Sequence, residues 1–252
     1  MTNDRILTKL DEHLHKNDYI AAERHLRYWQ NEAKAAKNVP QELLVTNELM
    51  GLYRKLGKKE SALSCVTAAL HLIEENEIGE QIGAATTYLN SATVYKAFGM
   101  AEQSLPLFER AQRIYEGQLA PNDSRLGGLY NNMALTLVDL GRFSEADALY
   151  RRAIRVMEQI ENGALEVAIT YLNMASAAEA EHGLLDADEQ IGTLLDRAEA
   201  LLEGDVPRDG YYAFVCEKCA SVFGYYGRFR FENQLRERAR RIYDDNQKHP
   251  GN

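Results

Sequence analysis

Apolar side chains recur at three- and four-residue steps along most of the chain, and residues 130–158 show the pattern most clearly. Before Gly141 the repeated apolar positions are Met133, Ala134, Leu137 and Leu140. After Gly141 they are Phe143, Ala146, Leu149, Tyr150, Ala153, Ile154 and Met157. Each set falls on one face of a helix, and the glycine interrupts the pattern between them. The stretch therefore predicts two antiparallel helices, which the alanine side chains allow to pack closely.

The same unit returns along the whole chain at a nearly constant period. The turn positions equivalent to Gly141 are Asn17, Gly57, Gly99, Gly183 and Gly227. Successive turns are 40, 42, 42, 42 and 44 residues apart. Self-similarity at a fixed period is the signature of a repeat array, in which each repeat contacts only its neighbours. The sequence therefore predicts an all-α fold of six helix pairs, over residues 3–37, 40–76, 78–118, 122–160, 163–203 and 208–247, with a frayed tail at 249–252.

The repeats resemble the tetratricopeptide repeat family. The family signature combines aromatic, leucine-like, small and tyrosine positions with a later alanine, aromatic and alanine, and residues 122–160 match it best. The usual period of the family is about 34 residues, so a period of about 42 adds about one turn to each helix. Repeats of this length are similar to those of the kinesin light chain subgroup, which residues 89–92, 104–108 and 130–134 also resemble. The resemblance implies a right-handed α-solenoid of about twelve helices that forms a single domain over residues 1–248.

Local signals refine the predicted helices. Pro40 stands at a first helical position, and residues 121–123, Pro-Asn-Asp, form a start signal for the fourth repeat. Proline inside a helix removes a hydrogen bond, but the resemblance indicates that Pro106 is tolerated near the start of a helix. In the fifth repeat Ala198 follows the turn glycine by 15 residues, whereas the spacing from Gly141 to the equivalent alanine is 12. The difference predicts a longer second helix in the fifth repeat.

Composition and charge exclude several classes of protein. No long uncharged apolar run is present, which argues against a transmembrane helix, and the N-terminus has no hydrophobic signal core. Three cysteines are too few for a disulfide framework and fit a reducing compartment, so a cytoplasmic location is expected. The net charge of −9 argues against nucleic acid as a partner, because binding to phosphates relies on clustered Lys and Arg. Residues 228–241 differ from the acidic remainder of the chain because they contain six arginines. This cluster indicates either a solvated cap or a basic docking surface.

The sequence carries none of the common catalytic signatures. It has no phosphate-binding glycine loop, no HExxH and no GxSxG, and its six histidines are scattered. No metal site or cofactor is therefore expected, and the protein is predicted not to be an enzyme. Cys216 and Cys219 form a CxxC, but they occupy the positions of Tyr130 and Met133, which favours packing in the core over a redox role.

A series of asparagines on the predicted first helices is the most informative polar feature. Asn90, Asn132 and Asn173 occupy the same place in successive repeats, 42 and 41 residues apart, and Asn47 and Asn131 lie one step away in their own repeats. The resemblance places the first helices on a concave surface, where related family members hold the main chain of an extended peptide with asparagines. An amide can donate and accept hydrogen bonds, as that role requires. The alternative is that these amides brace neighbouring helices.

Charged residues near the ends of the first helices predict a polarity for this groove. Arg54, Lys55 and Lys96 stand in the second and third repeats, and Asp139 and Glu179 stand at equivalent positions in the fourth and fifth. A bound peptide is therefore expected to place acidic residues over the second and third repeats and basic residues over the fourth and fifth. The alternative is that these side chains are ordinary solvated ends of helices.

Together these features predict a non-catalytic scaffold or adaptor that binds a protein or peptide. The repeats, the predicted groove and the lack of catalytic motifs favour a partner held as an extended segment. Two alternatives stay open. The protein could be a self-associating structural repeat protein, and hence a homo-oligomer, or a peptide-sensing regulator built from similar repeats.

Overall fold

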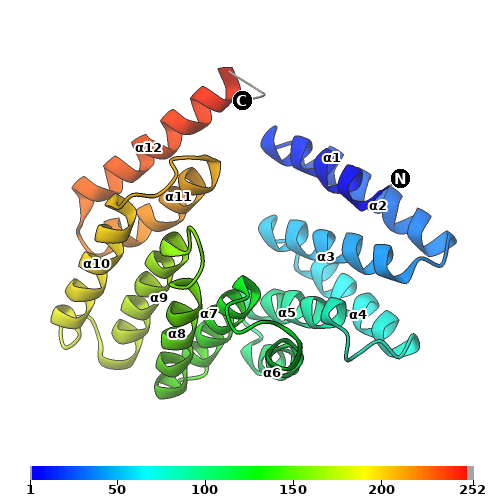
Figure 1. Cartoon of the computed structure of the whole chain (residues 1–252), viewed down its shortest axis with the longest axis horizontal. Helices are drawn as coiled ribbons and strands as arrows, with labels where there is room; N and C mark the ends of the chain where they lie inside the picture. Colours follow the sequence, from blue (N-terminus) through cyan, green and yellow to red (C-terminus); the bar gives the residue numbers. More distant parts are fainter. Residues whose placement is uncertain (1, 249–252) are drawn as a thin grey trace. The chain divides into compact units, whose positions relative to one another are not determined.

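The structure of the protein is a computed structural model that describes residues 2–248, and every regular element in this range is an α-helix. Twelve helices follow one another along this part of the chain (Figure 1). They are α1 Asn3–His15, α2 Tyr19–Ala35, α3 Val39–Lys55, α4 Lys59–Glu75, α5 Ile82–Ala97, α6 Ala101–Gln118, α7 Ser124–Asp139, α8 Phe143–Met157, α9 Ala164–His182, α10 Asp188–Glu203, α11 Gly210–Tyr225 and α12 Phe229–Lys248. Consecutive helices pair, from α1 with α2 to α11 with α12, so the predicted all-α fold of six helix pairs is confirmed. The predicted frayed tail at 249–252 lies outside the described residues.

The six predicted turn positions share the left-handed backbone conformation that ends a helix. The five glycines have φ between 67° and 82°, and Asn17 has φ of 53°. Glycine reaches this region without strain, and asparagine tolerates it better than most residues. The periodic residue therefore stops the first helix of each pair and lets the second return antiparallel.

The predicted helix starts are also confirmed. Pro40 lies in the first turn of α3, where the side chain of Asn38 caps the helix. Asp123 caps α7 in the same way. Pro106 lies inside α6 near its start, as the resemblance implied.

The helices gather into two compact units, one that ends at Leu119 and one that begins at Ala120. In the first unit α3 contacts α2 and α5 as well as its partner α4. In the second unit α9 contacts α7, α8 and α11 as well as its partner α10. First helices thus stack on first helices within each unit, which is how a repeat array buries a continuous core. The single domain expected over residues 1–248 stays a prediction.

Arginines of second helices cover tyrosines of first helices, an interaction that was not predicted from the sequence. The Arg110 guanidinium lies 4.4 Å from the ring centroid of Tyr88, and that of Arg152 lies 4.2 Å from the ring centroid of Tyr130. Both tyrosines are buried. Arg152 Nη2 also donates a hydrogen bond to the Tyr130 hydroxyl at 2.7 Å. Each contact therefore fastens together the two helices of one repeat.

Arg152→Ala should destabilise the second unit by about 1–3 kcal/mol, because it removes both the ring contact and the hydrogen bond. Arg151→Ala on the same helix should cost at most about 0.5 kcal/mol, because Arg151 is exposed and pairs with Asp147 one turn away. Urea unfolding followed by circular dichroism measures both changes. Equal unfolding midpoints would contradict the role given to Arg152.

The fifth helix pair departs from the others, but its second helix is only one residue longer than that of the fourth pair, less than the spacing predicted. α10 has 16 residues, compared with 15 in α8 and 18 in α6. The extra residues lie instead in the connection, which spans residues 183–187, whereas residues 140–142 suffice in the fourth pair. Gly183 ends α9 with φ of 82°, and Ala187, which is only 2% exposed, packs into the core before α10 begins. The connection thus returns to the core at Ala187, directly before α10 begins.

Candidate functional site

In the first unit the predicted binding asparagines Asn47 and Asn90 lie on α3 and α5, and both are half-buried. Asn47 Nδ2 donates to Thr87 Oγ1 on α5 at 3.0 Å. The Oδ1 of Asn47 is buried and has no hydrogen-bond partner among the described residues. Asn47 therefore braces α3 against α5 through its Nδ2. Its Oδ1 is removed from water without gaining a hydrogen bond, which costs free energy.

In the second unit asparagine amides also join first helices. Asn173 Nδ2 on α9 donates to Asn131 Oδ1 on α7 at 3.1 Å. Asn132 Nδ2 instead donates to the carbonyl oxygen of Gly128 within α7 at 2.9 Å. An asparagine amide has two N–H donors and an oxygen with two lone pairs, so each position keeps hydrogen-bonding capacity. The Asn131–Asn173 bond braces α7 against α9, whereas Asn132 bonds within its own helix, and the role of these amides toward a ligand stays a prediction.

The charged residues that were expected to give one groove its polarity fall in different units. Arg54, Lys55 and Lys96 lie in the first unit, and Asp139 and Glu179 lie in the second. The polarity of the groove along the whole array therefore stays a prediction.

Glu179 joins its own first helix to the next one. Its Oε1 accepts a hydrogen bond from the Tyr225 hydroxyl at 2.6 Å, and its Oε2 accepts one from the Tyr226 hydroxyl at 2.7 Å. Burial and the neighbouring Glu179 carboxylate raise the pKa of Tyr226, so both hydroxyls stay protonated donors at neutral pH. The carboxylate thus ties α9 to α11.

Glu48 occupies in α3 the place that Asn90 holds in α5, 42 residues later. The 42-residue spacing could have revealed it, but the asparagine series did not include it. The side chain is half-buried, and burial, with a smaller contribution from the charge of Asp11, raises the pKa of Glu48. An ionised carboxylate in this place destabilises the folded state at neutral pH.

Glu48→Gln should raise the melting temperature at neutral pH, because the amide keeps the shape of the side chain and removes its charge. The folded-state pKa of Glu48 lies above the unfolded value, so the folded state gains stability from this group as the pH falls through the raised pKa. The advantage of the variant should therefore shrink on acidification and vanish below about pH 4, where the carboxyl is protonated in both states. Thermal denaturation from neutral to acidic pH measures this, with the exposed Glu109→Gln as the control. A difference from wild type that does not change with pH would argue against the proposed cause.

An exposed aromatic stripe on α11 was not predicted from the sequence. Tyr211, Phe214 and Tyr225 are 43%, 50% and 67% exposed and share one face of the helix with Lys218. The rings of Tyr211 and Phe214 stack at a centroid distance of 6.2 Å, and the Tyr211 hydroxyl donates to Glu166 on α9. Large aromatic side chains gathered at the surface are typical of binding sites. Their spacing at i, i+3 and i+14 on one helix is the signal that could have revealed the stripe.

The opposite face of α11 is buried and holds the two cysteines of the CxxC sequence. Cys216 and Cys219 are 0% and 1% exposed, and they are free thiols, as is the buried Cys65. Burial raises the pKa of Cys219 to about 12. Because the thiolate is the reactive form, these residues are poorly suited to redox chemistry at neutral pH. The expected packing role is therefore confirmed.

The arginines of the last helix pair are largely matched by carboxylates. Arg228 pairs with Asp196 at 2.6 Å and Arg238 pairs with Glu203 at 2.7 Å, which fastens the last pair to α10. Three others pair with acidic residues within α12, namely Arg236, Arg240 and Arg241. These contacts favour the solvated cap over the basic docking surface.

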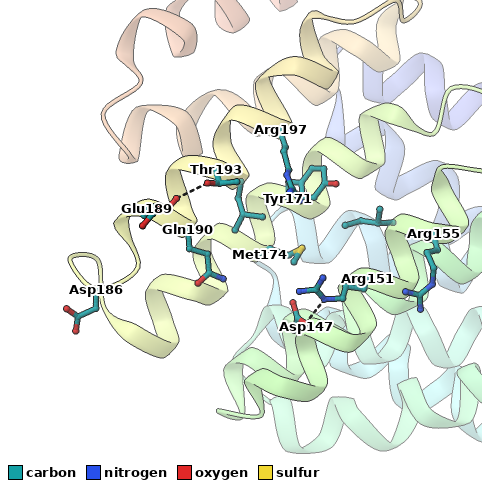
Figure 2. A pocket seen from close by; sticks show the side chains of 12 residues that line it. Asp147, Arg151, Arg155, Tyr171, Met174, Asp186, Glu189, Gln190, Thr193 and Arg197 are labelled. Carbon is teal, nitrogen blue, oxygen red and sulfur yellow. Dashed lines mark hydrogen bonds and ion pairs between the residues drawn. The ribbon is translucent and has the colours of Figure 1, made fainter.

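A groove that was not predicted from the sequence lies between α8 and α10 (Figure 2). It encloses about 650 Å³, and Tyr171 and Met174 of α9 line it between the two helices. The charged and polar side chains that line it are Asp147, Arg151 and Arg155 from α8, Asp186 from the long connection, and Glu189, Gln190, Thr193 and Arg197 from α10.

A second cavity of about 550 Å³ adjoins the groove at Tyr171 and Arg197, which line both. Its lining combines the apolar side chains Met157, Ile160, Val167, Leu201 and Val206 with the polar side chains Glu158, Asn162, Arg197 and Asp205. The Arg197 guanidinium lies 5.6 Å from the ring centroid of Tyr171, farther than the 4.2 Å between Arg152 and Tyr130. The groove thus lies beside the fifth helix pair, where the arginine–tyrosine contact is longer than in the fourth pair. The connection between the two helices of the fifth pair is also longer than in the fourth pair.

Two further observations concern residues 2–248. In this range no group of three or more His, Cys, Asp or Glu side chains is placed to hold a metal ion. No helix in the same range is long and apolar enough to cross a membrane.

Comparison with known proteins gives the class of the fold. Residues 128–159, which cover most of α7 and α8, match the family model described as tetratricopeptide repeat. The solved structures with this fold include kinesin light chain-like repeat proteins, so the expected resemblance to the tetratricopeptide repeat family is confirmed, and the resemblance to that subgroup is confirmed in fold. None of the curated proteins matches the sequence.

Two crystal structures illustrate the likeness. BtubC (BKLC) from P. vanneervenii has a TM-score of 0.68 and 19% sequence identity, over 81% of this chain and 82% of that one. A protein from Podosopora anserina, described as a kinesin light chain with nearly identical TPR-like repeats, has a TM-score of 0.57 and 16% identity, over 83% of this chain and 98% of that one. Identities this low show a shared fold. The chain has the fold of a tetratricopeptide-like helical repeat protein, and repeats with this fold form scaffolds for protein–protein interaction.

Proposed function

We propose that the protein is a non-catalytic scaffold or adaptor that holds an extended segment of a partner protein on its first helices. The aromatic stripe of α11 carries this proposal, because Tyr211, Phe214 and Tyr225 are exposed on a first helix that packs against α9. Covering a solvent-exposed aromatic side chain with a partner removes a large apolar area from water and so contributes much free energy to binding. Such side chains dominate the binding energy of many interfaces. The buried core beneath the stripe holds it in place.

The asparagines give the same surface a way to hold a main chain. Asn131 and Asn173 are bonded to each other, yet each keeps a donor or acceptor for a ligand. An extended segment presents N–H and C=O groups whatever its sequence, and amides suit both.

Charge adds a preference for the ligand. Arg54, Lys55 and Lys96 favour acidic ligand residues over the first unit, and Asp139 and Glu179 favour basic ones over the second. A cytoplasmic scaffold also fits the three cysteines, which are buried as free thiols and suit a reducing compartment.

Self-association is the second candidate function, because the exposed stripe could equally pack on a second copy of the chain. A peptide-sensing regulator would use the same surface for a free peptide. Light scattering over a wide concentration range separates self-association from a monomeric scaffold. A monomer at all concentrations, together with capture of a partner protein, supports the scaffold.

Replacing Asn90, Asn132 and Asn173 together by alanine tests the peptide-binding role of the amides. If they hold a ligand, affinity capture of partner proteins from the native cell should be lost while the melting temperature changes little. If they serve only as braces, the melting temperature should fall sharply because bonded groups lose their partners. Capture per folded molecule would then be unchanged, and that result would contradict the role in binding.

A further inference from the structure

The groove between α8 and α10 has the same order of charges on both walls. On α8, Arg155 follows Asp147 by eight residues, and on α10, Arg197 follows Glu189 by eight residues. Eight residues of helix extend about 12 Å. Because α8 and α10 each run antiparallel to α9, the carboxylates of both walls lie toward one end and the guanidinium groups toward the other.

The guanidinium groups of Arg155 and Arg197 are not neutralised within residues 2–248. Neither forms an ion pair or hydrogen bond with another described side chain, whereas Arg151 pairs with Asp147 at 2.7 Å. At the other end, the carboxylates of Asp186 and Glu189 also have no bonded side-chain partner in this range. Unmatched guanidinium groups that line one groove favour a ligand carboxylate, and the unmatched carboxylates favour a ligand cation.

Polar groups between these ends suit a main chain. The Gln190 amide has no partner among the described residues and offers donors and an acceptor. The Thr193 hydroxyl donates to the Glu189 carbonyl oxygen at 3.0 Å and keeps its lone pairs. An extended chain covers about 12 Å in about four residues and presents its N–H and C=O groups along the way.

The adjoining cavity offers an anchor site for an apolar side chain. Its volume of about 550 Å³ lies within the range of ligand sites, and its lining includes Met157, Val167 and Leu201. It meets the groove at Arg197, so the apolar site lies next to the guanidinium end. Burial of one large apolar side chain there would strengthen binding of the segment.

We propose that this groove is a second docking site, which binds an extended segment of a partner protein with a defined order of side chains. In the bound segment, an acidic residue of the partner lies between Arg155 and Arg197. A basic residue of the same segment, about four positions from the acidic one, faces Asp186 and Glu189. A large apolar residue of the segment, on the opposite side of the acidic residue, enters the adjoining cavity. The groove uses Tyr171 and Met174 of α9, whereas the first-helix surface uses Asn173, so both surfaces can be occupied at once.

Selection from a random peptide library displayed on phage, with the full chain as bait, tests the proposal. The peptides enriched should share the basic, acidic and apolar order, and fluorescence anisotropy should show them bound to the wild type. Arg155→Glu with Arg197→Glu should weaken binding of these peptides by at least about tenfold. Both arginines are exposed, and among the described residues Arg197 makes only the 5.6 Å contact with the Tyr171 ring, so circular dichroism should show a melting curve that is little changed.

Two controls keep this result specific to the groove. Arg230→Glu with Arg240→Glu changes the charge of the second unit by the same amount on α12 and should leave binding unchanged. Phe214→Ser alters the first-helix surface and should also leave it unchanged, so failure of one site does not decide the other. The proposal is overturned if no peptide with this charge order is enriched, or if the peptides that have it are insensitive to the charge reversals at Arg155 and Arg197. It is likewise overturned if light scattering shows a dimer that the reversals dissociate, because the groove is then an interface between copies.

Discussion

Ala134→Asp should unfold the second compact unit. Ala134 lies on α7 and is completely buried, so the new carboxylate would be placed in the core without a partner. An unpaired buried charge costs several kcal/mol, at least about 3, against a total stability of about 5–15 kcal/mol for a domain. Circular dichroism and the reactivity of the cysteines with a thiol reagent measure the loss. Ala148→Asp introduces the same group on the exposed face of α8 and should be close to wild type.

The cysteines also report how the two units are coupled. All three thiols are buried in the native protein, with Cys65 in the first unit and Cys216 and Cys219 in the second. In Ala134→Asp, reaction of Cys216 and Cys219 alone would show that the units unfold separately. Reaction of all three would support the single domain expected from the sequence. Identical melting curves for Ala134→Asp and Ala148→Asp would contradict the helix packing itself.

Gly163→Ala should destabilise the second unit, whereas the same substitution at Gly192 should stabilise it. A Cβ atom at Gly163 would lie 2.0 Å from the carbonyl oxygen of Met157, so the backbone between α8 and α9 would have to move. The expected cost is about 1–3 kcal/mol. Gly192 lies within α10, where a Cβ meets nothing within 4 Å, and alanine there should gain up to about 1 kcal/mol through helix propensity.

Thermal denaturation of the two glycine variants gives a direct comparison of sign. The melting temperature should fall for Gly163→Ala and rise for Gly192→Ala. If both shift in the same direction, the close approach of the chain at Gly163 is not as described.

The helix pairs could be predicted from the sequence because two independent signals repeat together. The apolar period of each helix and the left-handed residue in each turn, such as Gly141, recur at the same interval. In the fifth pair, the place of the extra residues could not be predicted from these two signals. Spacing revealed three extra residues, but residues 184–187 suit a helix as well as a turn. Burial of Ala187 decided between them, and burial depends on packing rather than on local sequence.

The candidate site was only partly predictable for similar reasons. Repeat comparison found Asn131 and Asn173, but their mutual hydrogen bond depends on how α7 and α9 stack. The α11 stripe was missed because the repeats were compared for positions that they share. Tyr211 stands 45 residues after Glu166, so the preceding repeat has no aromatic side chain at the corresponding place. The groove between α8 and α10 was missed because it results from helix spacing rather than from a pattern of residue types.

The central claim, that the first helices of a repeat scaffold hold a partner protein, is tested most directly by affinity capture with two matched double variants. Phe214→Ser with Tyr225→Ser removes two exposed aromatic side chains from α11. Ile20→Ser with Tyr28→Ser removes two large exposed side chains from α2, where they are 75% and 54% exposed. The first variant should lose at least about tenfold in affinity for the captured partner, because aromatic anchors carry about 2 kcal/mol or more each. The second variant should bind like wild type, and equal binding by both variants would contradict the account.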